Sequence, residues 1–262
     1  MLVVGELING MYKAVNKAIE EKDKKVIQKI AKDQLAQGAG MLDVNTGPYA
    51  KNPKDAMKWL VETIQDACDA PLCLDSTKAD VIEEGLKLAK KKAMINSTNS
   101  DDQKLDTLLP MAKKYNSFII GLTMGKSGVP RDKNERMEHA AKIVTKCQEA
   151  GVPVKDLYLD PIVMPVNVAQ SQGPEIMESI KEFAFLSDPA PNTIVGLSNA
   201  SQSTKDRPLI NRVYIAMAIA NGLTAAIMDP LDKELMDTAI TARLILNKNI
   251  YCDSFLEAYR KK

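Results

Sequence analysis

Short apolar segments alternate with longer amphipathic segments along the whole chain, and this alternation restricts the fold more than any other feature of the sequence. Eight short apolar runs begin at Leu2, Met41, Pro71, Ala93, Phe118, Leu157, Thr193 and Ala225. Continuous apolar runs of this length are typical of parallel strands that are covered on both faces. Eight strand–helix units in 262 residues predict an α/β protein with a single (β/α)8 TIM barrel, and a doubly wound open sheet is the alternative.

The segments between the runs have helical periodicity. Two of them place their apolar residues on one helical face: Met57, Leu60, Val61, Ile64 and Cys68 in residues 56–69, and Val81, Ile82, Leu86 and Ala89 in residues 79–91. Asp206 followed by Pro208 predicts another helix start, because Asp caps free amides and Pro loses no hydrogen bond in a first turn. No linker or repeat interrupts the pattern, so we expect one domain over residues 1–262.

Composition and charge indicate an ordinary globular protein. The chain has 35 basic and 34 acidic residues, a balance that predicts neither a nucleic-acid nor an anionic-membrane partner. The opening segment has no basic leader, and no later segment approaches the roughly 18–20 apolar residues of a membrane span. We therefore expect a cytoplasmic protein with no membrane partner.

Cysteine and histidine are too sparse to indicate a metal or disulfide framework. Cys68, Cys73, Cys147 and Cys252 form no C-x-x-C pair, so reduced thiols are expected. The single histidine, His139, lies in a segment with helical periodicity and reads as an ordinary residue of a surface helix. A Ser-His-Asp triad is therefore not expected.

Carboxylate and amide side chains recur where the predicted strands end. These polar strand-end residues are Glu6, Asn9, Asp43, Asn45, Asp75, Asn96, Thr123, Asp160, Asn199 and Asp229. Asp and Asn also cap helices and begin turns, but their presence at nearly every strand end favours a shared site. In a (β/α)8 barrel the carboxyl ends of the strands converge on the mouth, where catalysis occurs.

The residue types at the mouth favour one kind of ligand. No lysine lies in or directly after a strand, which argues against a Schiff-base enzyme. The carboxylates could hold magnesium, so a metal-dependent lyase stays as an alternative, although we expect no metal. Carboxylates and primary amides match a neutral heterocycle such as a pterin or a guanine-like ring. Asp75 and Asp160 could accept from its N–H donors, and Asn96 could match its mixed edge.

Six segments carry a family resemblance: GELING, LDVNTGP, PLCLDSTKADVIEEGL, MINSTN, LDPIVMPVN and VGLSNASQSTKDRPLIN. In this order, and along the whole chain, they resemble the methyltetrahydrofolate:corrinoid/iron-sulfur protein methyltransferases of the acetyl-CoA pathway. The chain is more distantly similar to the folate domain of cobalamin-dependent methionine synthase and to dihydropteroate synthase. The segment GLSNAS lacks the G-x-S-R-K pattern expected of the synthase, which argues against synthase activity.

The resemblance implies roles for the strand-end residues. Asp75, Asn96 and Asp160 would hold the pterin ring, and Asn199 would contact the methylated ring nitrogen. The full implied folate site consists of Glu6, Asn9, Asp75, Asn96, Asp160, Asn199, Gln202 and Arg207. Of these, Asn199, Asp75 and Asp160 are expected to be catalytic, because breaking the methyl–nitrogen bond needs hydrogen bonding or protonation at that nitrogen.

The resemblance also implies the reaction and its partners. The methyl group of 5-methyltetrahydrofolate would move to the cobalt(I) of a corrinoid. No D-x-H-x-x-G corrinoid-binding signature occurs in the sequence, so the corrinoid would arrive on a corrinoid/iron-sulfur protein, and no permanently bound cofactor is expected. A methyltetrahydrofolate-forming methyltransferase of a demethylase system is the alternative, and a non-catalytic pterin-binding protein is a further one.

Two surfaces are expected to make contacts. The resemblance implies a homodimer, with the helices after the sixth to eighth strands as the expected interface. The segment 123–135, with two glycines, a proline and mixed charges, is expected to move or to contact the partner.

Overall fold

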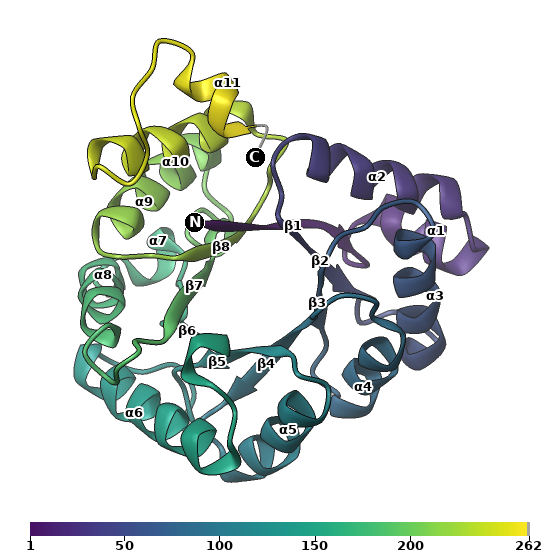
Figure 1. The fold of residues 1–262 in the computed structure, drawn as a ribbon, viewed down its shortest axis with the longest axis horizontal. Coiled ribbons are helices and arrows are strands. Elements are labelled where there is room, and N and C mark those ends of the chain that lie inside the picture. The colour runs from purple at the N-terminus through teal and green to yellow at the C-terminus, as the bar shows by residue number, and fades with distance from the viewer. Residues whose placement is uncertain (261–262) are drawn as a thin grey trace.

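The strands form a closed barrel. The computed structural model describes residues 1–260, and in it eight parallel strands follow one another around the barrel in chain order. Helices surround the strands on the outside (Figure 1). The structure therefore confirms the (β/α)8 barrel and excludes the doubly wound open sheet.

The strands lie where the apolar runs predicted them. They are β1 (Leu2–Asn9), β2 (Met41–Asn45), β3 (Leu72–Asp75), β4 (Met94–Asn99), β5 (Phe118–Leu122), β6 (Leu157–Asp160), β7 (Asn192–Gly196) and β8 (Ala225–Met228). The end of β7 differs from the prediction. The strand stops at Gly196, and Leu197–Asn199 forms a 3-10 turn, so Asn199 lies beyond the strand and not at its end.

The helices cover the barrel between successive strands. They are α1 (Lys13–Glu21), α2 (Lys24–Ala36), α3 (Pro53–Gln65), α4 (Ala79–Leu88), α5 (Asp102–Lys114), α6 (Lys133–Ala150), α7 (Val166–Ala169), α8 (Gln172–Phe183), α9 (Arg207–Ala220), α10 (Lys233–Ile245) and α11 (Phe255–Arg260). Pro208 lies in the first turn of α9, as predicted. Asp206 precedes the helix, but its side chain makes no capping hydrogen bond, because its ψ of 47° differs from the extended conformation of a typical cap.

Two apolar shells hold the barrel together. Outward-facing strand residues pack against buried residues of the helices, among them Met57 and Leu60 of α3 and Val81 of α4. Inside the barrel each strand contributes one residue to a separate cluster: Val4, Met41, Cys73, Met94, Ile120, Tyr158, Ile194 and Ala225. Cys68 lies past the end of α3 and is only half-buried.

The loops after β1 and β2 touch through glycines. A side chain on Gly10 would overlap the Thr46 carbonyl, and Gly47, with a φ of 73°, lies directly against Gly10. The Gly10 N–H also donates to the carbonyl of Asn45 at 2.9 Å. Only glycine permits this approach, which brings the ends of β1 and β2 together at the mouth.

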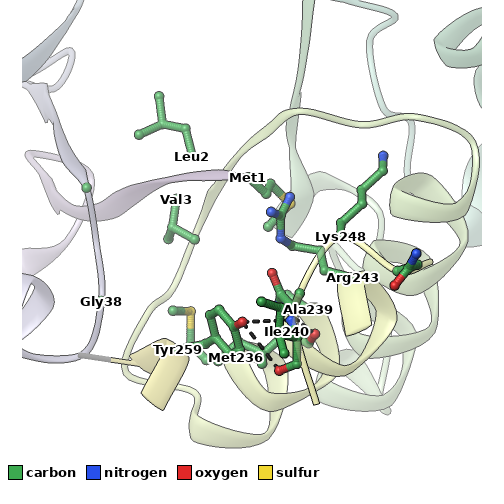
Figure 2. Close-up of a pocket in the computed structure, with 14 residues that line it drawn as sticks. Met1, Leu2, Val3, Gly38, Met236, Ala239, Ile240, Arg243, Lys248 and Tyr259 are labelled. Carbon is green, nitrogen blue, oxygen red and sulfur yellow. Dashed lines mark hydrogen bonds between the residues drawn. The ribbon is translucent and has the colours of Figure 1, made fainter. Parts of the chain in front are cut away.

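The opposite end of the barrel contains a cavity of about 610 Å³ between the start of β1 and the C-terminal helices. Figure 2 shows Leu2 and Val3 on one side of it and Arg243 and Lys248 near Met1. It is far from the strand-end carboxylates in the fold, because it lies at the amino ends of the strands. Over residues 1–260, no helix has the length and apolar character needed to cross a membrane.

Candidate functional site

Toward the mouth, the inward-facing side chains of the barrel change from apolar to polar. Side chains alternate along a strand, so the residue two positions after each member of the inner apolar cluster also faces inward. These residues are Glu6, Asp43, Asp75, Asn96, Leu122, Asp160, Gly196 and Ile227. Five of the eight carry a carboxylate or an amide, and they form a polar ring directly below the mouth.

Two carboxylates of this ring lie together on β2 and β3. Asn96 donates from Nδ2 to Oδ1 of Asp43 at 3.1 Å, and Asn45 donates from Nδ2 to Oδ2 of Asp75 at 2.6 Å. Burial raises the pKa of Asp43 well above its ordinary value, and the charge of Asp75 raises it further. Burial also raises the pKa of Asp75, while the Asn45 amide lowers it. The pair therefore binds a proton more readily than an isolated carboxylate does.

Asp160 occupies the ring at the end of β6 and is buried. Its Oδ1 accepts the N–H of Ile162 at 2.7 Å, and Thr123 donates from Oγ1 to its backbone carbonyl at 3.0 Å. Burial raises the pKa of Asp160 to about 7, although the Ile162 N–H and the Arg136 guanidinium act in the opposite direction. A group with this pKa changes its charge near neutral pH.

Glu6, the ring residue of β1, contacts the segment after β7. Ser198 donates from Oγ to Oε1 of Glu6 at 2.7 Å. Burial raises the pKa of Glu6; the Ser198 hydroxyl lowers it, Asp229 raises it and Arg207 lowers it again. The Arg207 side chain donates a hydrogen bond from Nε to Oγ of Ser201 at 3.2 Å.

The remaining predicted residues lie above the ring. Asn199 is exposed on its 3-10 turn, and its Nδ2 lies only 3.1 Å from the place that a Cβ on Gly196 would take. Its side chain therefore folds over an interior position of the barrel. Gln202 follows it and is exposed. The carbonyl oxygen of the Asn9 side chain accepts the N–H of Met11 at 2.9 Å, so it shapes the turn after β1.

The family described as "Pterin binding enzyme" matches residues 13–229 of the chain. The chain belongs to this family. A methylcorrinoid:tetrahydrofolate methyltransferase of Eubacterium limosum is 27% identical over 266 aligned residues, which cover 100% of this chain and 97% of that one. A methionine synthase of Mycobacterium tuberculosis is 26% identical over 87% of this chain, but the match spans only 20% of that protein.

Solved structures of pterin-binding enzymes share the fold. A Coxiella burnetii dihydropteroate synthase in complex with pteroic acid superposes with a TM-score of 0.68 at 16% identity, covering 93% of this chain and 94% of that one. A Yersinia pestis DHPS with a pterine-sulfa conjugate gives a TM-score of 0.66 at 18% identity, covering 94% of each chain. Identities this low support the barrel alone.

Some residues of the mouth of this pterin-binding enzyme were not assigned from the sequence. Asp43 and Asn45 were recognised as strand-end residues but not placed in the folate site, although their two-residue spacing in LDVN puts both on the inner face. Ser198 and Arg136 gave no sequence signal, because their partners are distant in the chain. His139 lies on the outer helix α6, as predicted; it is half-buried, and its Nδ1 lies 2.7 Å from Oγ of Ser100.

Metal ligands do not gather in the part of the chain that the structure describes. Over residues 1–260, no three His, Cys, Asp or Glu side chains are arranged so that they could hold a metal ion. Cys68, Cys73, Cys147 and Cys252 are free thiols.

Proposed function

We propose that this protein is a methyltransferase that moves a methyl group between N5 of tetrahydrofolate and the cobalt of a corrinoid carried by a separate protein. The observation that carries the proposal is the ring of inward-facing carboxylates and amides at the mouth of a barrel that belongs to the pterin-binding family. The full-length similarity to a methylcorrinoid:tetrahydrofolate methyltransferase supports the same reaction. In this proposal residues 1–262 act as one pterin-binding barrel domain.

Three ring residues would recognise the pterin. A carboxylate can accept two neighbouring N–H donors of the heterocycle at once, and Asp75 and Asp160 supply such acceptors on opposite parts of the ring. Asn96 can both donate and accept, and its Nδ2 already donates to Asp43, so its carbonyl oxygen is oriented by that bond. Glu6, Asn9, Gln202 and Arg207 would line the rest of the folate site.

Asn199 would act on the nitrogen that carries the methyl group. When the carbon–nitrogen bond breaks, its electron pair stays on N5, and a proton must reach that nitrogen. An amide can accept from a protonated amine or donate to a developing lone pair, so Asn199 can stabilise the transition state whichever form is present. Glu6, whose pKa burial raises, accepts from Ser198, the residue before Asn199, and would be a store of protons beside it.

Cobalt(I) would supply the electron pair of the new cobalt–methyl bond while N5 keeps the pair of the broken one. In the reverse direction N5 would supply the pair of its new methyl bond and cobalt would keep the other. The chain would supply only the folate site and the docking surface. A corrinoid/iron-sulfur protein of the acetyl-CoA pathway is the first partner to test. A corrinoid protein of a demethylase system, which would deliver methyl to tetrahydrofolate, is the second, because the relative that matches over 97% of its length is named as a methylcorrinoid:tetrahydrofolate methyltransferase.

Calorimetric titration with 5-methyltetrahydrofolate tests the binding half of the proposal. Binding that is unchanged by EDTA and weakened by Asp160→Asn is expected. No binding with or without EDTA would refute the folate site and leave the magnesium-dependent lyase, whose activity would need metal and would not respond to folates. Binding that EDTA abolishes would contradict the metal-free folate site. A spectroscopic assay with cob(I)alamin and 5-methyltetrahydrofolate, and with methylcobalamin and tetrahydrofolate, then tests the chemistry. Folate binding without either transfer would indicate a non-catalytic pterin-binding protein.

We further propose that two copies associate through α9. Leu209, Val213 and Met217 follow one another at four-residue spacing along this helix and are 62%, 50% and 51% exposed. They border a groove of about 660 Å³ between α8 and α9 that is lined mainly by apolar atoms. An apolar stripe on a single helix can pair with its own copy across a two-fold axis. The helix α9 follows the seventh strand, so it is one of the helices predicted to form the homodimer interface.

A further inference from the structure

Arg136 of α6 is completely buried, with 0% of its surface exposed. Its guanidinium donates from Nε to the carbonyl of Pro161 at 2.7 Å, from Nη1 to the carbonyl of Asp132 at 3.1 Å, and from Nη2 to Oε1 of Gln172 at 2.7 Å. All three acceptors are neutral. Burying a cation without a directly bonded carboxylate costs several kcal/mol, so a nearby negative charge is needed to make the position favourable.

Glu175, Asp132 and Glu135 supply negative charge around the guanidinium. Arg136 in turn acts on Asp160 and holds the loop that follows it. Pro161 and Ile162 directly follow Asp160, and the Ile162 N–H donates to Asp160 Oδ1 at 2.7 Å. Ile162 has a φ of 66°, which is strained for a β-branched residue. Arg136 therefore holds the carbonyl, and Asp160 Oδ1 holds the N–H, of the peptide that joins Pro161 to Ile162.

Among the charged groups, Arg136 is the cation that acts on Asp160. Tyr214 of α9 lies close enough that the Asp160 charge raises the pKa of its phenol, in addition to the larger effect of burial. Its hydroxyl is buried and has no hydrogen-bond partner within residues 1–260. Around Arg136 itself, Glu175 of α8 and the α6 residues Asp132 and Glu135 offset part of the guanidinium charge.

We propose that Arg136 is the positioning residue for Asp160: its buried guanidinium fastens the strained loop after β6 through the Pro161 carbonyl and holds a positive charge near the Asp160 carboxyl. This role rests on the proposed function only in so far as Asp160 binds the pterin. The effect on Asp160 itself can be measured without any folate.

The direct test is ¹³C NMR of the ligand-free protein labelled at aspartate carboxyls, with the Asp160 signal assigned by its loss in Asp160→Asn. In Arg136→Met the pKa of Asp160 is expected to rise measurably, because a nearby opposite charge is removed. Arg212→Met is the matched control: this arginine pairs with Asp232 and Glu234 on the far side of α9. An Asp160 pKa that is unchanged in folded Arg136→Met, or raised equally by the control, would overturn the proposal.

Arg136→Lys separates the effect of the Arg136 charge from the effect of its three hydrogen bonds. It also replaces Arg136→Met as the test if that variant does not fold. Lysine keeps the charge but lacks the planar fork that reaches three acceptors. The Asp160 pKa is expected to stay within about half a unit of wild type, while folate binding weakens several-fold. Unchanged folate affinity in this variant would contradict the fastening role. Wild-type protein that binds no folate would refute the proposed function, and the NMR titration would still decide the effect of Arg136 on Asp160.

Discussion

The affinity for 5-methyltetrahydrofolate is expected to fall as the pH falls through 7, and Asp160→Asn is expected to remove that dependence. Burial raises the pKa of Asp160 to about 7. The ionised carboxylate accepts the pterin N–H groups, so the binding contribution is present above this pKa and lost below it. The ionised fraction drops about tenfold between pH 8 and pH 6, which predicts a dissociation constant about tenfold larger at the lower pH.

The size of the effect at pH 8 follows from the bonds that are lost. Asp160→Asn keeps a carbonyl oxygen that can accept the Ile162 N–H, so the loop after β6 can stay in place. It loses the charge and one acceptor toward the pterin, a change worth about 1.5–3 kcal/mol for a hydrogen bond to a charged group. The dissociation constant at pH 8 is therefore expected to rise about 10- to 150-fold.

Isothermal titration calorimetry at pH 6, 7 and 8, at constant ionic strength, measures both effects. Asp229→Asn is the control, because this carboxylate also lies at the mouth and has a pKa raised by burial but has no assigned contact with the pterin. A wild-type affinity that does not change between pH 6 and 8, or a slope that persists in Asp160→Asn, would refute the role given to Asp160. Tighter binding at pH 6 would mean that the pterin selects the protonated carboxyl.

Four other outcomes are expected. Asn199→Ala should lower methyl transfer at least about tenfold, as for the loss of one transition-state donor, with little change in folate affinity; the reverse pattern would contradict its catalytic role. In thermal unfolding, Asp160→Asn should stabilise the protein more at pH 8 than at pH 5. The pKa of Asp160 is raised from 3.8 to about 7 by burial, so the wild-type protein loses stability as the pH rises between these two values, and the asparagine variant does not. Gly10→Ala should destabilise the fold by about 1–3 kcal/mol in urea unfolding, since its Cβ would overlap a neighbouring carbonyl, whereas Gly173→Ala, with no atom within 4 Å, should not. Val213→Glu should leave a monomer by light scattering; if wild type is already monomeric, the α9 interface is wrong.

The arrangement of strands was readable from the sequence because each strand carries its own local signal. A run such as LVVGELI or FIIGLT is apolar on both faces, and that pattern requires a sheet covered on both sides. The polar residue at the end of each run was equally visible, and parallel strands bring such residues to the same end. The parallel strands and most of the polar ring were therefore predictable without any long-range information.

Other features depend on contacts between distant parts of the chain. Ser198 meets Glu6 across 192 positions of sequence, and nothing near either residue indicates the other. The 3-10 turn that carries Asn199 replaces the last residues of the expected strand, because the chain turns after Gly196. Local periodicity does not reveal such a turn.

The sequence by itself determined eight parallel strands with polar residues at their ends, since strand length, apolar character and terminal residue type are local properties. That the strands close into a barrel was decided by the tertiary structure. The tertiary structure alone decided which carboxylates share hydrogen bonds, which ones are buried enough to have a raised pKa, and which cation faces them. Arg136 illustrates the difference: its segment has the helical periodicity of a surface helix, and only the packing of α6 against the loop after β6 buries its guanidinium near Asp160. Burial and charge pairing depend on distances between elements, and those distances exist only in the folded chain.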